Sequence, residues 1–397
     1  MKIKLSYTVS LFALLTLSIS LWWFWPQPVA LKPASFTQLP GWKTTNVKKS
    51  LLAFQVSCRT FLRQNPEQSV GSQHLDLKAK DWQPACRAAL AIESPSDKKA
   101  RNFFQKWFTP VQFYNKKPVP GLFTGYYMPL LHGSMTQTEE YNVPIYGLPT
   151  NIVTIQLGQF DPELKYRRVV GRIEGNKVLP FHNREEINKG AIQTKAPVLV
   201  WVNSSIDRLF LEIQGSGVVK LDDGKEMYVG YAGENGAPYT PVGRVLIQKG
   251  VLSREKSSMQ DIKSYLEAHP EEIDPVLNQN KSFVFFRKLD RNVALGAQGV
   301  ALTPGYSLAI DRKWIPLGAP LWLNTTRPDS QTDKNKVLQR LMIAQDTGGA
   351  IRGVVRGDVY WGAGENATFI AGHMKNQGNY WLLLPRHTLA RLQKEFS

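Results

Sequence analysis

Apolar positions follow two different periodicities along this chain. In residues 46–65 and 83–108 they recur at the three- and four-residue spacing of amphipathic helices. From residue 121 onward, short apolar runs between glycines and prolines predict strands or hairpins, at residues 198–202, 208–213, 221–229 and 282–286. Residues 240–278 return to helical spacing, and residues 325–336 are polar enough to predict a loop. The pattern predicts a mainly β fold with α additions.

Two acidic side chains interrupt the last apolar strands. Asp346 and Asp358 stand at the ends of two short apolar segments that a glycine-rich turn joins. Burial opposes the charge of a carboxylate, and sites that accept this cost often need a proton donor near neutral pH. The alternative is that both are ordinary turn residues, since aspartate before glycine or threonine is common in turns.

Five segments combine glycine with aromatic or amide side chains, as sugar-binding sites do. An aromatic ring covers the apolar face of a sugar, while amides and backbone groups meet its hydroxyls. Taken singly, each segment is better explained by a β-turn with a packed aromatic ring. Together they make a glycan site the leading interpretation. The segments are residues 123–127, 214–217, 231–236, 309–318 and 341–362.

These segments, together with Arg184-Glu-Glu-Ile187 and Ser282-Phe-Val-Phe-Phe286, resemble the membrane-bound lytic murein transglycosylase A family, in the family's order, from about residue 121 to 380. The resemblance implies a double-psi β-barrel domain and a smaller inserted β-rich domain, with a groove between them. We expect residues 1–30 to form a signal peptide or membrane anchor and residues 31–127 a linker and helical lead-in that packs on the barrel. Residues 128–284 would form the substrate-binding insert, and residues 285–397 the catalytic domain with three aspartates.

The resemblance also assigns roles to residues. The family's catalytic aspartate falls on Asp358 and its neighbour on Asp346, while Asp311 is expected to support the site. We expect sugar contacts from the glycine-containing segments, at Thr124, Gly125, Tyr126, Gln214, Gly215, Ser216, Gly217, Tyr231 and Asn235.

The reaction that the resemblance implies is cleavage of peptidoglycan between N-acetylmuramic acid and N-acetylglucosamine. One aspartate would act first as acid and then as base, leaving a 1,6-anhydro sugar end. The alternatives are a peptidoglycan hydrolase and a non-catalytic wall-binding protein. Asp346-Thr347-Gly348 also resembles the active-site turn of aspartic proteases, but the sequence has no second such segment.

The amino terminus and the composition indicate where the protein works and what kind of partner it binds. Residues 1–30 have a basic start and an apolar run, which predicts export to the periplasm or cell envelope by a cleaved signal or a retained anchor. No cysteine comes directly after this run, so a typical lipoprotein is not expected. The net charge of +17 favours a polyanionic partner, here peptidoglycan strands, and no nucleic-acid motif is found.

Two further expectations concern the cysteines and cofactors. Cys58 and Cys86 are the only cysteines, and in an exported chain a disulfide between them is favoured over two buried thiols. The six histidines are scattered without ligand spacing, so neither a metal nor another cofactor is expected. The protein is expected to be a monomer.

Overall fold

The computed structural model describes residues 29–165, 167–253, 256–290 and 292–395. The predicted signal or anchor falls almost wholly outside these residues. Within them, no helix has the length and apolar character needed to cross a membrane.

Six strands close into a barrel. The ring closes because β18 pairs with β15 on one side and with β4 on the other. Two of its pairings are parallel, β14 with β16 and β17 with β4. The strands, in order round the ring, are β4 (Gly121–Met128), β18 (Lys375–Pro385), β15 (Pro320–Asp329), β16 (Thr332–Asp346), β14 (Ser307–Ile310) and β17 (Arg356–Ala363). A mainly β fold with a closed barrel is therefore confirmed.

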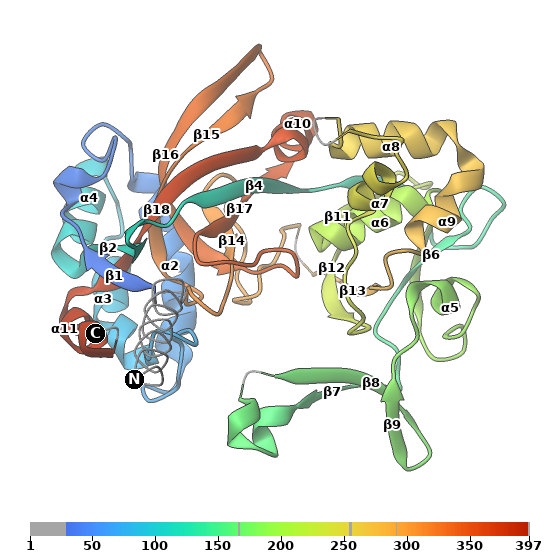
Figure 1. Ribbon diagram of the computed structural model, residues 1–397, viewed down its shortest axis with the longest axis horizontal. Helices are drawn as coiled ribbons and strands as arrows, with labels where there is room; N and C mark the ends of the chain where they lie inside the picture. Colours follow the sequence, from blue (N-terminus) through green and yellow to red (C-terminus); the bar gives the residue numbers. More distant parts are fainter. Residues whose placement is uncertain (1–28, 166, 254–255, 291, 396–397) are drawn as a thin grey trace, which may run out of the picture.

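Helices from the first part of the chain pack against this barrel, at the left of Figure 1. They are α2 (Lys48–Arg63), α3 (Ala79–Leu90) and α4 (Asp97–Trp107), joined by the C-terminal α11 (Leu389–Glu395). β1 (Ala30–Pro33), β2 (Phe108–Asn115) and β3 (Lys117–Pro118) extend the barrel sheet beyond β18. Phe54, Trp82 and Trp322 are fully buried between the helices and the barrel. The two predicted amino-terminal helical regions are confirmed, with the second divided into α3 and α4.

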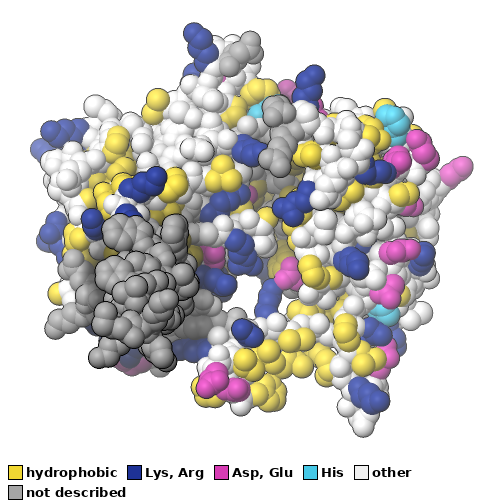
Figure 2. Space-filling view, viewed as in Figure 1, with side chains coloured by type: hydrophobic (Ala, Val, Ile, Leu, Met, Phe, Trp, Pro, Cys, Tyr) yellow, Lys and Arg dark blue, Asp and Glu magenta, His cyan; other side chains and the backbone are white. Residues whose placement is uncertain are grey.

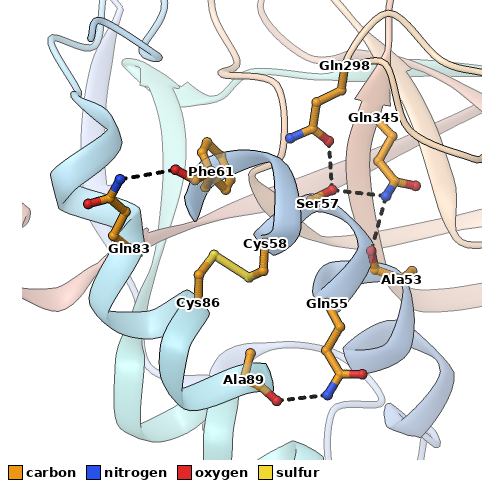
Figure 3. Close-up of a disulfide and its surroundings, with 10 residues drawn as sticks. All are labelled: Ala53, Gln55, Ser57, Cys58, Phe61, Gln83, Cys86, Ala89, Gln298 and Gln345. Carbon is orange, nitrogen blue, oxygen red and sulfur yellow. Dashed lines mark hydrogen bonds between the residues drawn. A yellow bond between two sulfur atoms is a disulfide. The ribbon is translucent and has the colours of Figure 1, made fainter. Parts of the chain in front are cut away.

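A disulfide joins two of these helices. Cys58 on α2 and Cys86 on α3 are bonded, with their Cα atoms 4.9 Å apart (Figure 3). The rings of Phe61 and Trp82 stack beside the disulfide, with their centroids 5.3 Å apart. The disulfide and the stacked rings fix α2 on α3.

The insert between β4 and β14 forms a second sheet, at the right of Figure 1. Its strands are β13 (Val284–Lys288), β12 (Glu226–Glu234), β11 (Ser216–Leu221), β5 (Leu130–Ser134), β10 (Val198–Val202) and β6 (Val143–Tyr146). Its helices are α5 (Arg184–Asn188), α6 (Ser205–Gln214), α7 (Val242–Gln248), α8 (Met259–Ala268) and α9 (Ile273–Leu277). The predicted hairpin at Asp223-Gly224 joins β11 to β12, and the helical region at 240–278 is α7 to α9.

A three-stranded arm projects from the insert, at the bottom of Figure 1. It consists of β7 (Ile152–Gln156), β8 (Arg168–Glu174) and β9 (Lys177–Pro180). Figure 2 shows an opening between the barrel, the insert sheet and this arm, with Lys and Arg side chains around it.

Two local predictions were wrong. Residues 208–213 are helical, because Ser204 caps α6 by accepting a hydrogen bond from the Asp207 amide, and because Ile206, Leu209 and Phe210 bury one helical face. Residues 325–336 do not form a long loop. They continue β15 and β16, which pair up to Asp329 and Thr332, so the polar composition here belongs to a pair of strands and their tight turn.

Candidate active site

The two candidate aspartates are brought together by strand pairing. Ala309 on β14 pairs with Asp358 on β17 along one edge and with Asp346 on β16 along the other. Both carboxyl groups are half-buried. They therefore lie on β16 and β17, the two strands that flank β14 in the barrel, although twelve positions separate them in the sequence.

Asp358 is held by Thr124 from the next strand. The Thr124 hydroxyl donates to Oδ1 of Asp358 at 2.6 Å, and Arg356 Nη2 donates to the same hydroxyl oxygen at 2.8 Å. Burial raises the pKa of Asp358 to about 6, against the lowering effects of the Arg356 charge and the Thr124 hydrogen bond, and the charge on Asp346 adds to the rise. This carboxyl group carries a proton at mildly acidic pH.

Asp346 accepts more hydrogen bonds than Asp358 does. Its Oδ2 accepts from the Tyr126 hydroxyl at 2.8 Å, and its Oδ1 accepts from the amides of Ala297 at 2.9 Å and Thr347 at 2.8 Å. Burial raises the pKa of Asp346 above the ordinary value, and these three hydrogen bonds oppose the rise. They stabilise the ionised form, so two carboxyl groups in one site experience different surroundings.

Aromatic rings surround the pair. Tyr126 and Tyr360 occupy paired positions on β4 and β17, and their ring centroids are 5.2 Å apart. On the opposite face of β4, Gly125 lies against Trp361, where an added Cβ would be 2.7 Å from the indole Nε1. Glycine is required there because the Trp361 ring occupies the space of a side chain.

Asp311 is buried outside the pair. Its carboxylate accepts hydrogen bonds from the amides of Lys313 at 3.0 Å and Gly353 at 2.9 Å. Arg352 lies 3.7 Å away. Asp311 thus fastens the turn after β14 to the loop that leads into β17, which fits the supporting position expected for it.

The segment Gln214-Gly-Ser-Gly217 lies at the junction of the barrel and the insert. Gln214 Oε1 accepts from the amide of Tyr127, and Gly215 ends α6 with φ of 78°. An added Cβ on Gly217 would be 3.0 Å from the Pro129 carbonyl oxygen. Ser216 is buried at the start of β11. These residues hold β4 against α6 and β11, and the structure does not place them beside the aspartates.

The two remaining predicted contacts lie apart from the aspartates. Asn235 is 2% exposed, and its amide bonds to the backbone of His182, Lys281, Phe283 and Ala237. All its hydrogen-bonding atoms are occupied, so it braces the insert. Tyr231 is 43% exposed and lines a cavity of about 280 Å³ at the base of the arm, together with Arg168 and Glu234.

A larger cavity of about 490 Å³ lies behind the site. It is lined by Tyr127, Phe210, Met259 and Phe369 among others, from β4, α6, α8 and α10 (Glu365–His373). Successive side chains on a strand point to opposite faces, so Tyr127 is turned away from the face of Thr124 and Tyr126. This cavity is distinct from the aspartate pair.

The sequence left open whether Arg356 points toward Asp358. Arg356 precedes Asp358 by two positions on one strand, and the period of two places both side chains on one face. No sequence signal marks the Ala297 amide, which reaches Asp346 from a loop.

In the described ranges, no group of three or more His, Cys, Asp or Glu side chains is arranged to hold a metal ion.

Comparisons with known proteins agree with this architecture. Residues 122–287 match the MltA specific insert domain, and residues 306–384 match the 3D domain. The chain is 35% identical over 264 residues to the membrane-bound lytic murein transglycosylase A of Escherichia coli strain K12, a match covering 66% of this chain and 65% of that protein. The matched stretch thus spans just under two thirds of that curated relative.

Solved structures extend the similarity over most of the chain. MltA from Neisseria gonorrhoeae is 35% identical with a TM-score of 0.75, over 90% of this chain and 93% of that one. A membrane-bound lytic murein transglycosylase from Agrobacterium tumefaciens is 30% identical with a TM-score of 0.80, over 91% and 99%. Escherichia coli MltA with bound chitohexaose is 27% identical with a TM-score of 0.64, over 90% and 95%. The chain belongs to the membrane-bound lytic murein transglycosylase A family.

Proposed function

We propose that this protein is a peptidoglycan lytic transglycosylase with Asp358 as its catalytic residue. The observation that carries the proposal is the environment of Asp358, a carboxyl group with a pKa raised to about 6 and with a second carboxylate, Asp346, across β14 from it. A general acid is most effective when its pKa lies near the working pH.

The substrate is the glycan strand of peptidoglycan, cut at the β-1,4 bond between N-acetylmuramic acid and N-acetylglucosamine. A relative with the same fold was solved with chitohexaose, an oligosaccharide. The net charge of +17 and the basic side chains around the opening in Figure 2 suit a polymer whose stem peptides carry carboxylates. Tyr126 and Tyr360 are buried against each other beside the aspartates, so their rings help to keep water from the two carboxyl groups.

The hydrogen bonds at Asp358 direct its proton. A guanidinium only donates, so Thr124 Oγ1 accepts from Arg356 and turns its own hydrogen to Oδ1 of Asp358. The acidic proton then resides on Oδ2, which has no partner within the described part of the chain. In the first step this proton passes to the glycosidic oxygen, the bond from that oxygen to the anomeric carbon of N-acetylmuramic acid breaks, and an oxocarbenium-like sugar forms.

In the second step Asp358 acts as a base. Its ionised carboxylate takes the proton of the 6-hydroxyl of the same sugar, and that oxygen bonds to the anomeric carbon. Asp358 regains the proton it gave, and no water is consumed. Thr124 and Arg356 stabilise the ionised form between the two steps.

Asp346 is assigned an electrostatic role. Its three donors keep it the more readily ionised carboxyl group of the pair, and its charge contributes to the raised pKa of Asp358. The negative charge of Asp346 also stabilises the positive charge that develops on the sugar. The export segment expected in residues 1–30 would place this reaction in the periplasm or cell envelope, with the protein acting as a monomer held at a membrane.

A peptidoglycan hydrolase is the competing function, because two carboxyl groups in one site also suit a hydrolase. The test is to incubate the full-length protein with purified murein and determine product masses. A lytic transglycosylase releases 1,6-anhydro ends, whereas a hydrolase releases products heavier by one water. If neither product is released, wall binding without cleavage is the remaining candidate function.

A further inference from the structure

A chain of hydrogen-bonded polar side chains connects the disulfide-linked helices to the loop that supports Asp346. It consists of Ser57 on α2, Gln298 in the loop before β14, and Gln345, the residue immediately before Asp346 (Figure 3). No charged group takes part. Ser57 and Gln345 are fully buried, and buried polar groups whose hydrogen bonds are all satisfied fix one arrangement.

Gln345 is at the centre of this chain and is fully buried. Its Nε2 donates to the Ser57 hydroxyl at 2.9 Å and to the Ala53 carbonyl at 3.1 Å, both on α2. Its Oε1 accepts from the Ser307 hydroxyl on β14 at 2.5 Å. Every hydrogen-bonding atom of this amide is occupied, so the orientation of Gln345 is set by α2 and β14 together.

Ser57 passes the connection to the loop. Having accepted from Gln345, its hydroxyl donates to Oε1 of Gln298 at 2.7 Å. The backbone amide of Gln298 also donates to the backbone carbonyl of Gln345 at 3.1 Å. The loop is therefore fastened to β16 by its backbone and to α2 by its side chain.

The residue before Gln298 contacts the candidate active site directly. Ala297 donates its amide to Oδ1 of Asp346 at 2.9 Å. The approach is close, because an added Cβ on Gly296 would lie 2.3 Å from the Gln345 carbonyl oxygen. A small movement of Gln298 would thus move the amide that stabilises the Asp346 carboxylate.

We propose that Ser57 and Gln298 are positioning residues for catalysis, through which the disulfide-linked helix α2 holds the Ala297 amide on Asp346. The inference rests on the proposed function, since it assigns this support to the charged partner of Asp358. Gln55 provides a matched contrast on the same helix. Its amide donates to the Ala89 and Ile92 carbonyls of the α3 region, away from the site.

The test compares Ser57→Ala with Gln55→Ala in the full-length protein. Both changes remove buried hydrogen bonds of α2, so both lower stability, but only Ser57→Ala releases the loop. We expect Ser57→Ala to lower kcat by roughly tenfold with KM unchanged, because displacing a catalytic group by ~1 Å can cost up to ~100-fold. The acid limb of the pH–rate profile, assigned to Asp346, should move to higher pH because an amide donor is lost. Ser57→Thr keeps the hydroxyl and should restore both values.

Gln298→Ala breaks the same hydrogen bond from a partly exposed position and covers the case in which Ser57→Ala does not fold. Carbon-13 NMR titration of the aspartate carboxyl groups gives a readout that does not depend on turnover. A higher Asp346 pKa in Ser57→Ala or Gln298→Ala than in Gln55→Ala supports the proposal. Equal kcat, pH profile and Asp346 pKa in these variants would overturn it. A wild-type protein that releases no anhydro products would refute the proposed function instead.

Discussion

Asp358 accepts a 2.6 Å hydrogen bond from Thr124, and the two residues occupy paired positions on the parallel strands β17 and β4. Strand pairing therefore fixes the separation of donor and acceptor, independently of any loop. One oxygen of the carboxyl group is committed to Thr124, and the other is left for a substrate. The assignment of Asp358 as a directed proton donor follows from this relationship.

Thr124→Val tests that hydrogen bond. It removes a donor that stabilises ionised Asp358, so the pKa of Asp358 should rise by roughly one unit. The alkaline limb of the pH–rate profile should move to higher pH by the same amount. The value of kcat should fall, because the Asp358 carboxylate that the first step produces is less well stabilised. Thr124→Ser, which keeps the hydroxyl, should resemble wild type. An alkaline limb that stays in place or moves to lower pH would show that Thr124 does not set this pKa.

The pH dependence of turnover follows from the acid role. Asp358 must start protonated, and its pKa is raised to about 6, so turnover of purified murein should decline as pH rises through 6. At the acid side, protonation of Asp346 should reduce the rate, giving a bell-shaped profile. Initial rates measured between pH 4 and 9 with anhydro-muropeptide detection check this. A rate that stays constant up to pH 8 is incompatible with a protonated Asp358.

Asp358→Asn should stabilise the folded protein at neutral pH. The folded carboxyl group keeps its proton up to about pH 6, whereas in the unfolded chain it ionises near 3.8, so between these values the folded state binds more protons. The wild-type free energy of unfolding therefore falls as pH rises through this window, and the asparagine variant is spared that loss. We expect a gain of about 1–3 kcal/mol at pH 8 that disappears below pH 4. Denaturant unfolding at both pH values measures it, and equal stabilities at pH 8 would contradict the buried, proton-holding environment.

Gly125→Ala tests the packing behind the site. Its Cβ would lie 2.7 Å from Trp361 Nε1 and 2.9 Å from the Cα of Ala371 on α10, so β4 or α10 must shift. Overpacking of this kind costs about 1–3 kcal/mol of unfolding free energy. Gly349→Ala is the control, because an added Cβ there meets nothing within 4 Å. Similar stabilities of the two variants would show that Trp361 moves aside freely.

The sequence predicted those parts of the site that lie on regular strands. Asp346 was found because it ends the apolar run of β16, and Asp358 because it directly precedes the apolar residues Val359 to Trp361 of β17. Thr124 and Tyr126 alternate along β4, and the period of two places both on the side of the aspartates. Local composition was sufficient there, because one buried face repeats along each strand.

Other features depend on contacts between distant segments, which local patterns do not contain. Asn235 has the amide that a sugar site would use, but that amide is satisfied by the backbone of segments around residues 182 and 281–283. Residues 208–213 have the composition of a strand, and the helix depends on the Ser204 cap and on the buried pairing of Glu212 with Arg184. The Ala297 amide that reaches Asp346 belongs to a loop whose Gln298 is bonded to Ser57 of α2, far earlier in the chain.

The most direct measurement is the chemical identity of the cleavage products in water labelled with heavy oxygen. The account predicts that wild-type protein releases 1,6-anhydromuramic acid ends without the label, and that Asp358→Asn, although folded and stable, releases none. Labelled, hydrated ends from the wild type, or unimpaired release of anhydro ends by the folded Asp358→Asn variant, would contradict it.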